Sequence, residues 1–570
     1  MEQFLRQLQT IPEAAELIRR VEEGGCPAAV SGLQPVQRAC VGAAVAAACG
    51  RPAVFLCGDE REVQVLSADL ETLTGRRPVT LLGREWQFRP GAVGSRDWER
   101  SRLAALYALA QGDAPVVVAT ADGLMARTLP PETLRSLAIT LEVGGQAELG
   151  ALAEQLLSAG YTRCEQVEGV GQFALRGGIL DVFSPLMDQP VRCEFFDDEI
   201  DSMGAFDPGT QRRTRNVSSA RILPAAEVLP QFTPGGYGGL LEGLDRLISQ
   251  AKRRKGSETL VQTLEEDRER LAAGTAFPAM DRYIALIYPV MATAADYFPE
   301  DAVVVLSESP RVAERGKSYL WQLGEDAKAL MERGELAGEL ADFARTFEEL
   351  TEVLADWPVC YLDAFTSSRY PQRPRTLLNL LTKQLPSYGA SLETAVSDLA
   401  HYVSDGFRTV VLVSSEQRAL NLQALLREQK MTTAVDFQLH ELPGYGKAVI
   451  AVGGLTAGME YPVGRFAVLT EGQSLLGKKR RSKPVTNRQK LGSYADLSPG
   501  DLVVHEHHGV GRYVGMVKMP ADGIEKDYVK IAYAGSDVLY VPATQLDLVS
   551  KYIGSGEDAQ ETRKLSRLGG

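Results

Sequence analysis

The sequence predicts a multidomain α/β protein that ends in a small β-rich domain. At 570 residues the chain is too long for a single hydrophobic core, and it predicts about three to five domains. Two regions, from about 25 to 125 and from about 350 to 475, alternate short apolar segments with helical ones. That alternation is typical of parallel sheets covered by helices. Near the C-terminus the pattern changes to the period-two alternation of half-buried strands.

Bulk composition excludes several classes of protein. No stretch approaches the ~18 uninterrupted apolar residues of a membrane-spanning helix, and the N-terminal twenty residues predict a charged amphipathic helix without a signal-peptide layout. The seven cysteines show no CxxC pairing, which predicts reduced thiols in a cytoplasmic protein. A net charge of −13 argues against a surface that coats nucleic acid indiscriminately.

The order of patterns divides the chain into segments. Residues 1–125 predict the first part of an α/β domain, and 126–213 predict an α+β insert because strands there are joined by Gly, Pro and Asp turns. Residues 214–349 are rich in helical patterns and return to the first domain. The remaining segments are a second α/β domain (350–475, with expected strands at 359–364, 408–415, 447–454 and 465–471), a basic linker (476–495), a β domain (496–553) and a tail (554–570).

The strand, turn and Ala-rich helix at 28–48 have the layout of a phosphate-binding loop, yet the residues of the turn do not match the motif. The turn begins at Gly32, but Gln37 stands where the second glycine is needed and Ala39 lacks the hydroxyl that holds Mg²⁺. Arg38 keeps the charge of the motif lysine with a different shape. We therefore expect no hydrolysis of nucleoside triphosphates here; a plain strand–turn–helix fits these residues about as well as a degenerate loop.

A second segment favours the degenerate loop. The apolar strand "DAVVVL" ends in Ser307 and Glu308, where a nucleotide-hydrolysing enzyme of this fold has Asp-Glu, the Asp ordering the Mg²⁺ shell. Two halves of one nucleotide site are thus both altered, in the order that a helicase-like fold would place them.

Two further motifs carry less information. The run from Lys478 to Lys490 holds seven basic residues and no acid, which fits a solvated linker or a weak nucleic-acid contact. "HEHH" at 505–508 suggests metal ligands, but neighbouring strand residues point to opposite faces and no cysteine lies nearby, so we interpret it as a strand and turn.

Taken together, "YFPEDAVVVLSESPRV", the degenerate loop and "FALRGGILDVFSP…VRCEFFDDEIDSMGAFDPGTQR" resemble the excision-repair protein UvrB. They resemble still more closely the UvrB-like part of the bacterial transcription-repair coupling factors. The segment 497–553 is similar to the RNA-polymerase-interacting module of that family, which is related to the CarD-type (Tudor/CarD-like) regulators. The chain ends at "KLSRLGG", so we expect it to be a fragment without the family's two-lobed translocase.

The resemblance implies that the α+β insert binds UvrA through Arg176, Arg192 and Phe196. The residues themselves agree, because Arg192, Glu194 and Phe196 alternate onto one strand face, and arginine with an aromatic anchor is typical of interface hot spots. In the alternative interpretation Phe196 belongs to the core, and the arginines pair with Asp197, Asp198 or Glu199.

For the C-terminal β domain the resemblance implies an edge strand that pairs with the RNA polymerase β subunit, through Met519 with Val517 and Lys518. Simple alternation predicts Tyr513, Gly515, Val517 and Met519 on one face. The alternative is that Met519 only closes the core of the barrel.

The sequence thus predicts a non-catalytic recruitment platform that binds stalled RNA polymerase and UvrA and directs nucleotide excision repair to transcribed strands. We expect no cofactor in this chain. The resemblance implies ATP, Mg²⁺ and most DNA contacts for the translocase part of the complete factor. The competing functions are an ATP-dependent UvrB-like helicase and a CarD-like transcription regulator.

Overall fold

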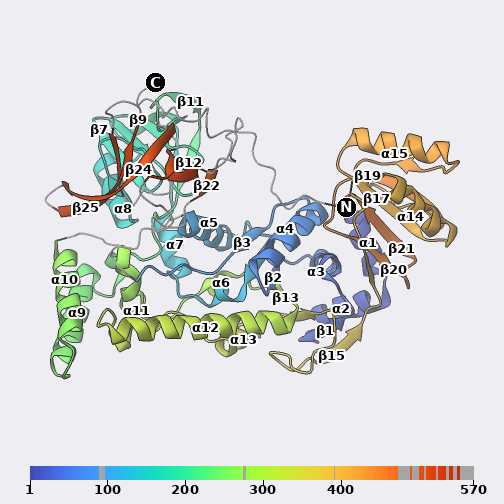
Figure 1. The fold of residues 1–570 in the computed structure, drawn as a ribbon, viewed down its shortest axis with the longest axis horizontal. Coiled ribbons are helices and arrows are strands. Elements are labelled where there is room, and N and C mark those ends of the chain that lie inside the picture. Colours follow the sequence, from blue (N-terminus) through green and yellow to red (C-terminus); the bar gives the residue numbers. More distant parts are fainter. Residues whose placement is uncertain are drawn as a thin grey trace.

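The computed structural model describes residues 1–88, 97–273, 278–389, 392–472, 488–490, 500–505, 509–521, 524–533, 538–542 and 549–552. It has the expected multidomain α/β architecture, with two sheets built mainly from parallel strands, an antiparallel insert and a small β-rich C-terminal part (Figure 1). Within the described residues no helix is both long and apolar enough to cross a membrane.

The N-terminal segment forms two helices where the sequence predicted one. α1 (Glu2–Gln9) ends at Thr10, and α2 (Pro12–Glu22) begins with a proline at its first position. The break follows from Ile11, whose extended backbone precedes Pro12, because the residue before a proline is disfavoured in helical geometry. Both helices bury their apolar faces against α3.

The first sheet contains seven strands in the order β15-β1-β14-β13-β2-β4-β3, and every neighbouring pair is parallel. Its strands are β1 (Ala28–Ser31), β2 (Ala53–Cys57), β3 (Val79–Leu81), β4 (Val116–Thr120), β13 (Val303–Ser307), β14 (Val359–Leu362) and β15 (Thr376–Asn379). The accompanying helices are α3 (Pro35–Cys49), α4 (Glu60–Thr74), α5 (Asp97–Ala110), α6 (Ala121–Met125), α7 (Pro131–Leu137), α12 (Ser309–Glu332) and α13 (Phe347–Leu354).

The second α/β unit begins later than the predicted residue 350, because β14 and β15 belong to the first sheet. β14 lies between β1 and β13, two strands that are remote in sequence. Its apolar run suits the centre of either sheet, so the sequence pattern alone could not assign it.

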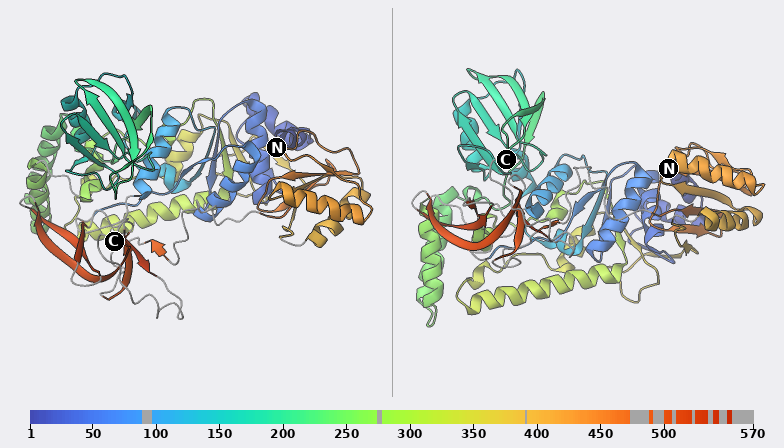
Figure 2. Two further views of the ribbon diagram at one scale, coloured as in Figure 1. Left: turned by 90° about the horizontal axis from the view of Figure 1, so that it is seen from above. Right: turned by 45° about the horizontal axis from the view of Figure 1, so that its top comes forward.

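The insert is a six-stranded sheet in the order β11-β10-β9-β8-β7-β6. These strands are β6 (Thr162–Arg163), β7 (Gln172–Arg176), β8 (Ile179–Val182), β9 (Val191–Phe196), β10 (Glu199–Phe206) and β11 (Arg213–Asn216). One face packs against α8 (Leu149–Ser158) and against the two-stranded pair of β5 (Ile139–Glu142) and β12 (Ser219–Ile222). Figure 2 shows this sheet standing apart from the seven-stranded sheet.

The helical region that follows includes the long α12, which runs beneath the first sheet in Figure 1. Its remaining helices are α9 (Gly236–Lys252), α10 (Glu258–Ala272) and α11 (Ile284–Ile287), with short 3₁₀ turns η1 (Pro230–Phe232), η2 (Pro278–Tyr283), η3 (Ala294–Tyr297) and η4 (Gly338–Leu340).

The second sheet follows the order β16-β20-β21-β17-β19-β18. It comprises β16 (Lys383–Leu385), β17 (Arg408–Val413), β18 (Ala434–Val435), β19 (Lys447–Val452), β20 (Gly458–Tyr461) and β21 (Phe466–Thr470), with helices α14 (Leu392–Ser404) and α15 (Glu416–Glu428). One hydrophobic cluster joins this sheet to α3, so the two α/β units share a core. At the same junction, Asp69 of α4 accepts hydrogen bonds from the backbone and hydroxyl of Thr456, at 2.7 and 2.6 Å.

The C-terminal sheet is antiparallel, in the order β22-β27-β23-β24-β25-β26. Its strands are β22 (Arg488–Lys490), β23 (Leu502–His505), β24 (Gly509–Ala521), β25 (Ile524–Ala532), β26 (Val538–Pro542) and β27 (Val549–Tyr552).

The expected strict alternation along β24 is wrong. The register shifts between Tyr513 and Gly515, where Gly515 has φ +147°. Such a bulge moves the side chains that follow by one position. Met516 therefore packs on the core cluster that includes Tyr513.

Candidate functional site

The loop after β1 and the end of β13 meet around the guanidinium of Arg38, which is 3% exposed. Its Nε donates to the Ser307 hydroxyl at 2.7 Å, and its two terminal nitrogens donate to Glu308 at 2.5 Å and to Glu62 at 2.9 Å. Ser307 in turn donates to Glu62 at 2.7 Å. We call these four residues the Arg38 cluster. In this cluster the charge at the motif-lysine position is held by the protein's own carboxylates.

The N-terminus of α3 is closed by its own side chains. Gln37 Oε1 accepts the backbone N–H of Gln34 at 3.0 Å, and the two residues form a reciprocal capping box. Gln37 and Ala39 are both fully buried. A phosphate-binding loop instead leaves such N–H groups free to face an anion, so the geometry does not offer this helix end to a ligand.

Gly32 lies beneath the segment that follows β15. It has φ +92°, and a Cβ atom added there would lie 2.2 Å from the Leu380 carbonyl oxygen. The Gly32 carbonyl accepts the Thr382 hydroxyl at 2.5 Å, and its N–H donates to the Ala364 carbonyl at 3.1 Å. Two crossing segments therefore cover the turn where a nucleotide phosphate would lie in a phosphate-binding loop.

A buried carboxyl lies beside the cluster. Asp363 follows β14 and accepts the backbone N–H and hydroxyl of Ser309 at 2.6 and 3.1 Å. Burial raises the pKa of Asp363 to about 6, although the hydrogen bonds from Ser309 act in the opposite direction.

The structure brings together all six residues predicted for the degenerate nucleotide site, which are Gly32, Gln37, Arg38, Ala39, Ser307 and Glu308. Sequence reasoning missed Glu62, which reaches the cluster from the first turn of α4. No motif marks it, because an acidic residue in a first helical turn is ordinary.

On the insert, Arg176 and Arg192 converge on one buried carboxylate. Asp181 of β8 is fully buried, accepts two hydrogen bonds from Arg192 at 2.7 and 2.8 Å, and accepts one from Arg176 at 2.6 Å. Arg192 also lies over the Phe206 ring, 4.7 Å from its centroid. The partner of both arginines is thus Asp181, and not Asp197, Asp198 or Glu199 as in the alternative interpretation. The sequence feature that could have identified Asp181 as this partner is a single acidic residue within the otherwise apolar strand "ILDV".

Phe196 lies at the end of β9, before the two-residue turn to β10, and is 80% exposed. The interpretation of Phe196 as a core residue is therefore wrong. Val191 and Cys193 face the main core of the insert while Arg192 and Glu194 are half-buried, so the predicted alternation along β9 holds. Arginine and an exposed aromatic ring thus share one sheet face.

The predicted polymerase-contacting residues lie on β24. Val517 is half-buried, and the backbones of Lys518 and Met519 pair with Asp527 and Lys526 of β25. β23 pairs with β24 only from Gly509 to Arg512. The Tyr513 backbone still bonds to Gly500 and Asp501, and from Val514 onward β25 is the one partner strand of β24 among the described residues.

Other candidates fall outside the described residues. These include most of the basic run at 478–490 and the last three residues of "HEHH". In the part of the chain that the structure describes, no group of three or more His, Cys, Asp or Glu residues is arranged to hold a metal ion.

Comparison with known proteins assigns two of these regions. Residues 139–228, which include the insert sheet, match the UvrB interaction domain. Residues 497–553 match the CarD-like/TRCF RID domain. The chain as a whole is similar to the transcription-repair-coupling factors.

The relationship extends along nearly the whole chain. The transcription-repair-coupling factor of Bacillus subtilis is 30% identical over 563 residues, which cover 97% of this chain and 47% of that protein. Those of Staphylococcus haemolyticus and Staphylococcus aureus are each 32% identical over 477 residues, or 82% of this chain and 40% of theirs. The chain spans less than half the length of these relatives.

Proposed function

We propose that this chain is a non-catalytic recruitment platform that joins RNA polymerase to excision repair. The insert would bind UvrA through Phe196, Arg176 and Arg192, and the C-terminal sheet would bind the polymerase β subunit. The observation that carries the proposal is the 80% exposed Phe196 on the sheet face that also carries two arginines fixed on Asp181. A rigid cationic and aromatic surface is typical of an interface hot spot.

Fixing both arginines on one carboxylate prepares the surface for binding. Arginine side chains lose up to about 2 kcal/mol of rotamer entropy when they are ordered. Asp181 orders Arg176 and Arg192 before any partner arrives. Arg176 remains about half exposed, so its free N–H groups can still meet a carboxylate or carbonyl of the partner.

The Arg38 cluster supports the non-catalytic part of the proposal. Binding of a nucleotide at this turn would require Arg38 to leave both Glu62 and Glu308, and Thr382 to leave Gly32. Leaving two largely buried carboxylates without their cation is strongly unfavourable. ATP hydrolysis, Mg²⁺ and DNA translocation would then belong to other parts of the complete factor.

On the C-terminal sheet, the supporting observation is the length of β24. Its outer part, from Val514 onward, has β25 on one edge and no second partner strand among the described residues. Such an edge can accept a strand from another protein. Lys518 and Met519 lie in this outer part, as the polymerase contact requires.

The decisive experiment measures binding of this chain to purified UvrA by fluorescence anisotropy or calorimetry. Phe196→Ala together with Arg176→Ala should weaken binding at least ~30-fold, which corresponds to ~2 kcal/mol for a hot spot. Arg192 is kept, so that Asp181 retains a bidentate partner. Leu157→Ala is the matched control, because Leu157 is 52% exposed on α8, on the opposite side of the insert.

Two parallel measurements separate the competing functions. Micromolar ATP binding that Arg38→Ala abolishes would favour a UvrB-like helicase over a recruitment platform. Binding to the polymerase β subunit that depends on Met519, without any binding to UvrA, would favour a CarD-like regulator.

A further inference from the structure

The segment from Ala364 to Leu392 contains four basic residues and no acidic one, within a chain whose net charge is −13. It connects β14 to β15, forms β15 and continues through β16 into the second sheet. Between Arg373 and Lys383 every second residue is exposed. We call this set the β15 stripe, and its members are Arg373, Arg375, Leu377, Asn379, Leu381 and Lys383.

The stripe is an open face of an edge strand. β15 pairs only with β1, and no further strand lies beyond it among the described residues. Leu377 and Leu381 are 62% and 60% exposed, whereas Leu378 and Leu380, between them, pack on the shared core. An edge strand with exposed leucines offers backbone hydrogen-bonding groups and apolar contact at once, which is the composition that proteins usually avoid on a free edge.

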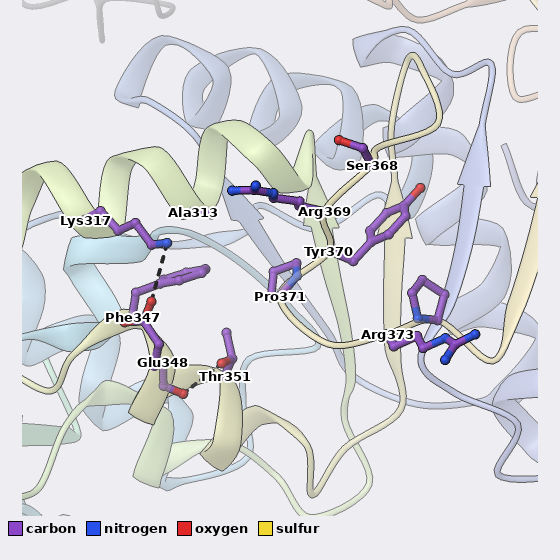
Figure 3. A pocket seen from close by; sticks show the side chains of 11 residues that line it. Ala313, Lys317, Phe347, Glu348, Thr351, Ser368, Arg369, Tyr370, Pro371 and Arg373 are labelled. Atoms are coloured by element: carbon purple, nitrogen blue, oxygen red, sulfur yellow. Dashed lines mark hydrogen bonds and ion pairs between the residues drawn. The ribbon is translucent and has the colours of Figure 1, made fainter.

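A cavity adjoins one end of the stripe, and an exposed aromatic side chain lies at the other end. At the start, Arg373 and Pro374 line a cavity of about 570 Å³ between α12, α13 and the 368–374 loop (Figure 3). Lys317 and Arg369 also line it, and its single acidic residue, Glu348, pairs with Lys317 at 3.4 Å. At the other end Phe365 is 84% exposed. The neighbouring Thr366 hydroxyl donates to Ser31 at 3.1 Å, and Ser31 donates to Asn379 of β15 at 3.1 Å.

We propose that the β15 stripe is a docking site for an extended acidic polypeptide segment, which adds to β15 as an outer strand. Backbone pairing supplies affinity in strand addition, and alternate side chains supply specificity. The residues that face the stripe would then be acidic opposite Arg373, Arg375 and Lys383, and apolar opposite Leu377 and Leu381. This proposal does not depend on the binding of UvrA or polymerase.

The chemistry favours this occupant over two others. A second copy of the chain would bring like-charged stripes together, which is unfavourable for directly opposed strand residues. Single-stranded nucleic acid would use the basic residues, but it gains its remaining affinity from stacking on aromatic rings rather than from leucines. The two exposed leucines on a free backbone edge therefore indicate a polypeptide.

The test uses two labelled peptides. In the first, every second residue reads Glu-Glu-Val-Thr-Val-Glu, and threonine fills the positions between these residues. The second peptide has the same sequence in reverse order. One of the two should bind the whole chain with an affinity that falls as salt rises. Leu377→Asp with Leu381→Asp should weaken binding at least tenfold, and Arg373→Ser with Arg375→Ser should do the same. Leu420→Asp on α15, where the leucine is 47% exposed, is the matched control.

Amide hydrogen exchange distinguishes strand addition from simple charge attraction. In the complex, amides within Thr376–Leu381 should become protected, while all variants should keep the melting temperature of the parent chain because the changed side chains are exposed. Absence of binding by both peptides at millimolar concentration would overturn the proposal. So would binding without protection of β15, or preferential binding of a short DNA strand that the arginine variant abolishes and the leucine variant does not.

Discussion

Replacing Arg38 by methionine tests whether the Arg38 cluster is a structural device. Methionine keeps much of the side-chain volume and removes the charge and all the hydrogen-bond donors. Arg38 donates to Ser307, Glu308, Glu62 and the Leu33 carbonyl. Because Glu62 is only 7% exposed, its carboxylate would be left in a low-dielectric site with the Ser307 hydroxyl and the Gly58 N–H as its remaining donors.

The expected cost follows from that burial. Removing one partner of a buried ion pair costs about 3–5 kcal/mol, because it leaves an uncompensated charge. With a urea dependence of about 2 kcal/mol per molar, a loss of about 4 kcal/mol lowers the unfolding midpoint of this unit by about 2 M. Glu62→Gln added to Arg38→Met should recover a large part of the loss, since it removes the orphaned charge.

The assay is urea unfolding followed by circular dichroism and tryptophan fluorescence. Arg311→Met is the matched control, because Arg311 pairs with Asp59 at 2.6 Å while its side chain is 56% exposed. An exposed pair of this kind contributes at most about 1 kcal/mol. If Arg38→Met costs no more than Arg311→Met, or if Glu62→Gln fails to compensate, the interpretation of the cluster as a charge-balanced structural unit is refuted.

Two further predictions concern the junction of the α/β units and the closed turn. Burial raises the pKa of Asp69 to about 7 from the ordinary 3.8, so its contribution to stability is present below about pH 4 and is lost as the pH rises through about 7. The Asp69→Asn variant should therefore be more stable than the parent at pH 8, by up to about 4 kcal/mol. Its melting temperature should also depend less on pH. A variant that is less stable than the parent at pH 8 would contradict this explanation. Gly32→Ala should lower stability by more than about 2 kcal/mol in urea unfolding, because the added Cβ meets the Leu380 carbonyl at 2.2 Å. Gly50→Ala has similar φ strain in open space and should cost only about 1 kcal/mol, so equal losses in the two variants would exclude the contact as the cause.

Much of the architecture could be predicted from local pattern. The buried strands at β1, β2, β4 and β13 are continuous apolar runs of the kind that parallel sheets require. What the pattern could not supply was the order of strands. β14 joins the first sheet between β1 and β13, although it follows β13 by about fifty residues and resembles the strands of the second sheet.

The candidate sites show the same difference between what local sequence pattern predicts and what depends on tertiary structure. The sequence singled out Arg38 and Ser307 by their positions after two apolar strands, but their common partner Glu62 comes from a third element and carries no motif. On the insert, the exposure of Phe196 depends on its place beside a hairpin turn. On β24, the bulge after Tyr513 could not be read from alternation, although Gly515 is the residue type that such a bulge favours.

The Arg38 cluster and the shared core together brace the first sheet and its helices. In an ATPase the loop before α3 must open to a ligand, whereas here α3 is buried between two sheets and its first turn is capped from within. The parts that remain open are Phe196 beside a hairpin turn of the insert, the outer length of β24, and the β15 stripe, whose strand pairs with β1 next to that turn. Because the cluster bonds α3, α4 and the end of β13 to one another, movement of any one of them would have to break a buried hydrogen bond or ion pair. We therefore infer that this framework holds the β15 stripe, whose strand pairs with β1 of the same sheet, in a fixed position.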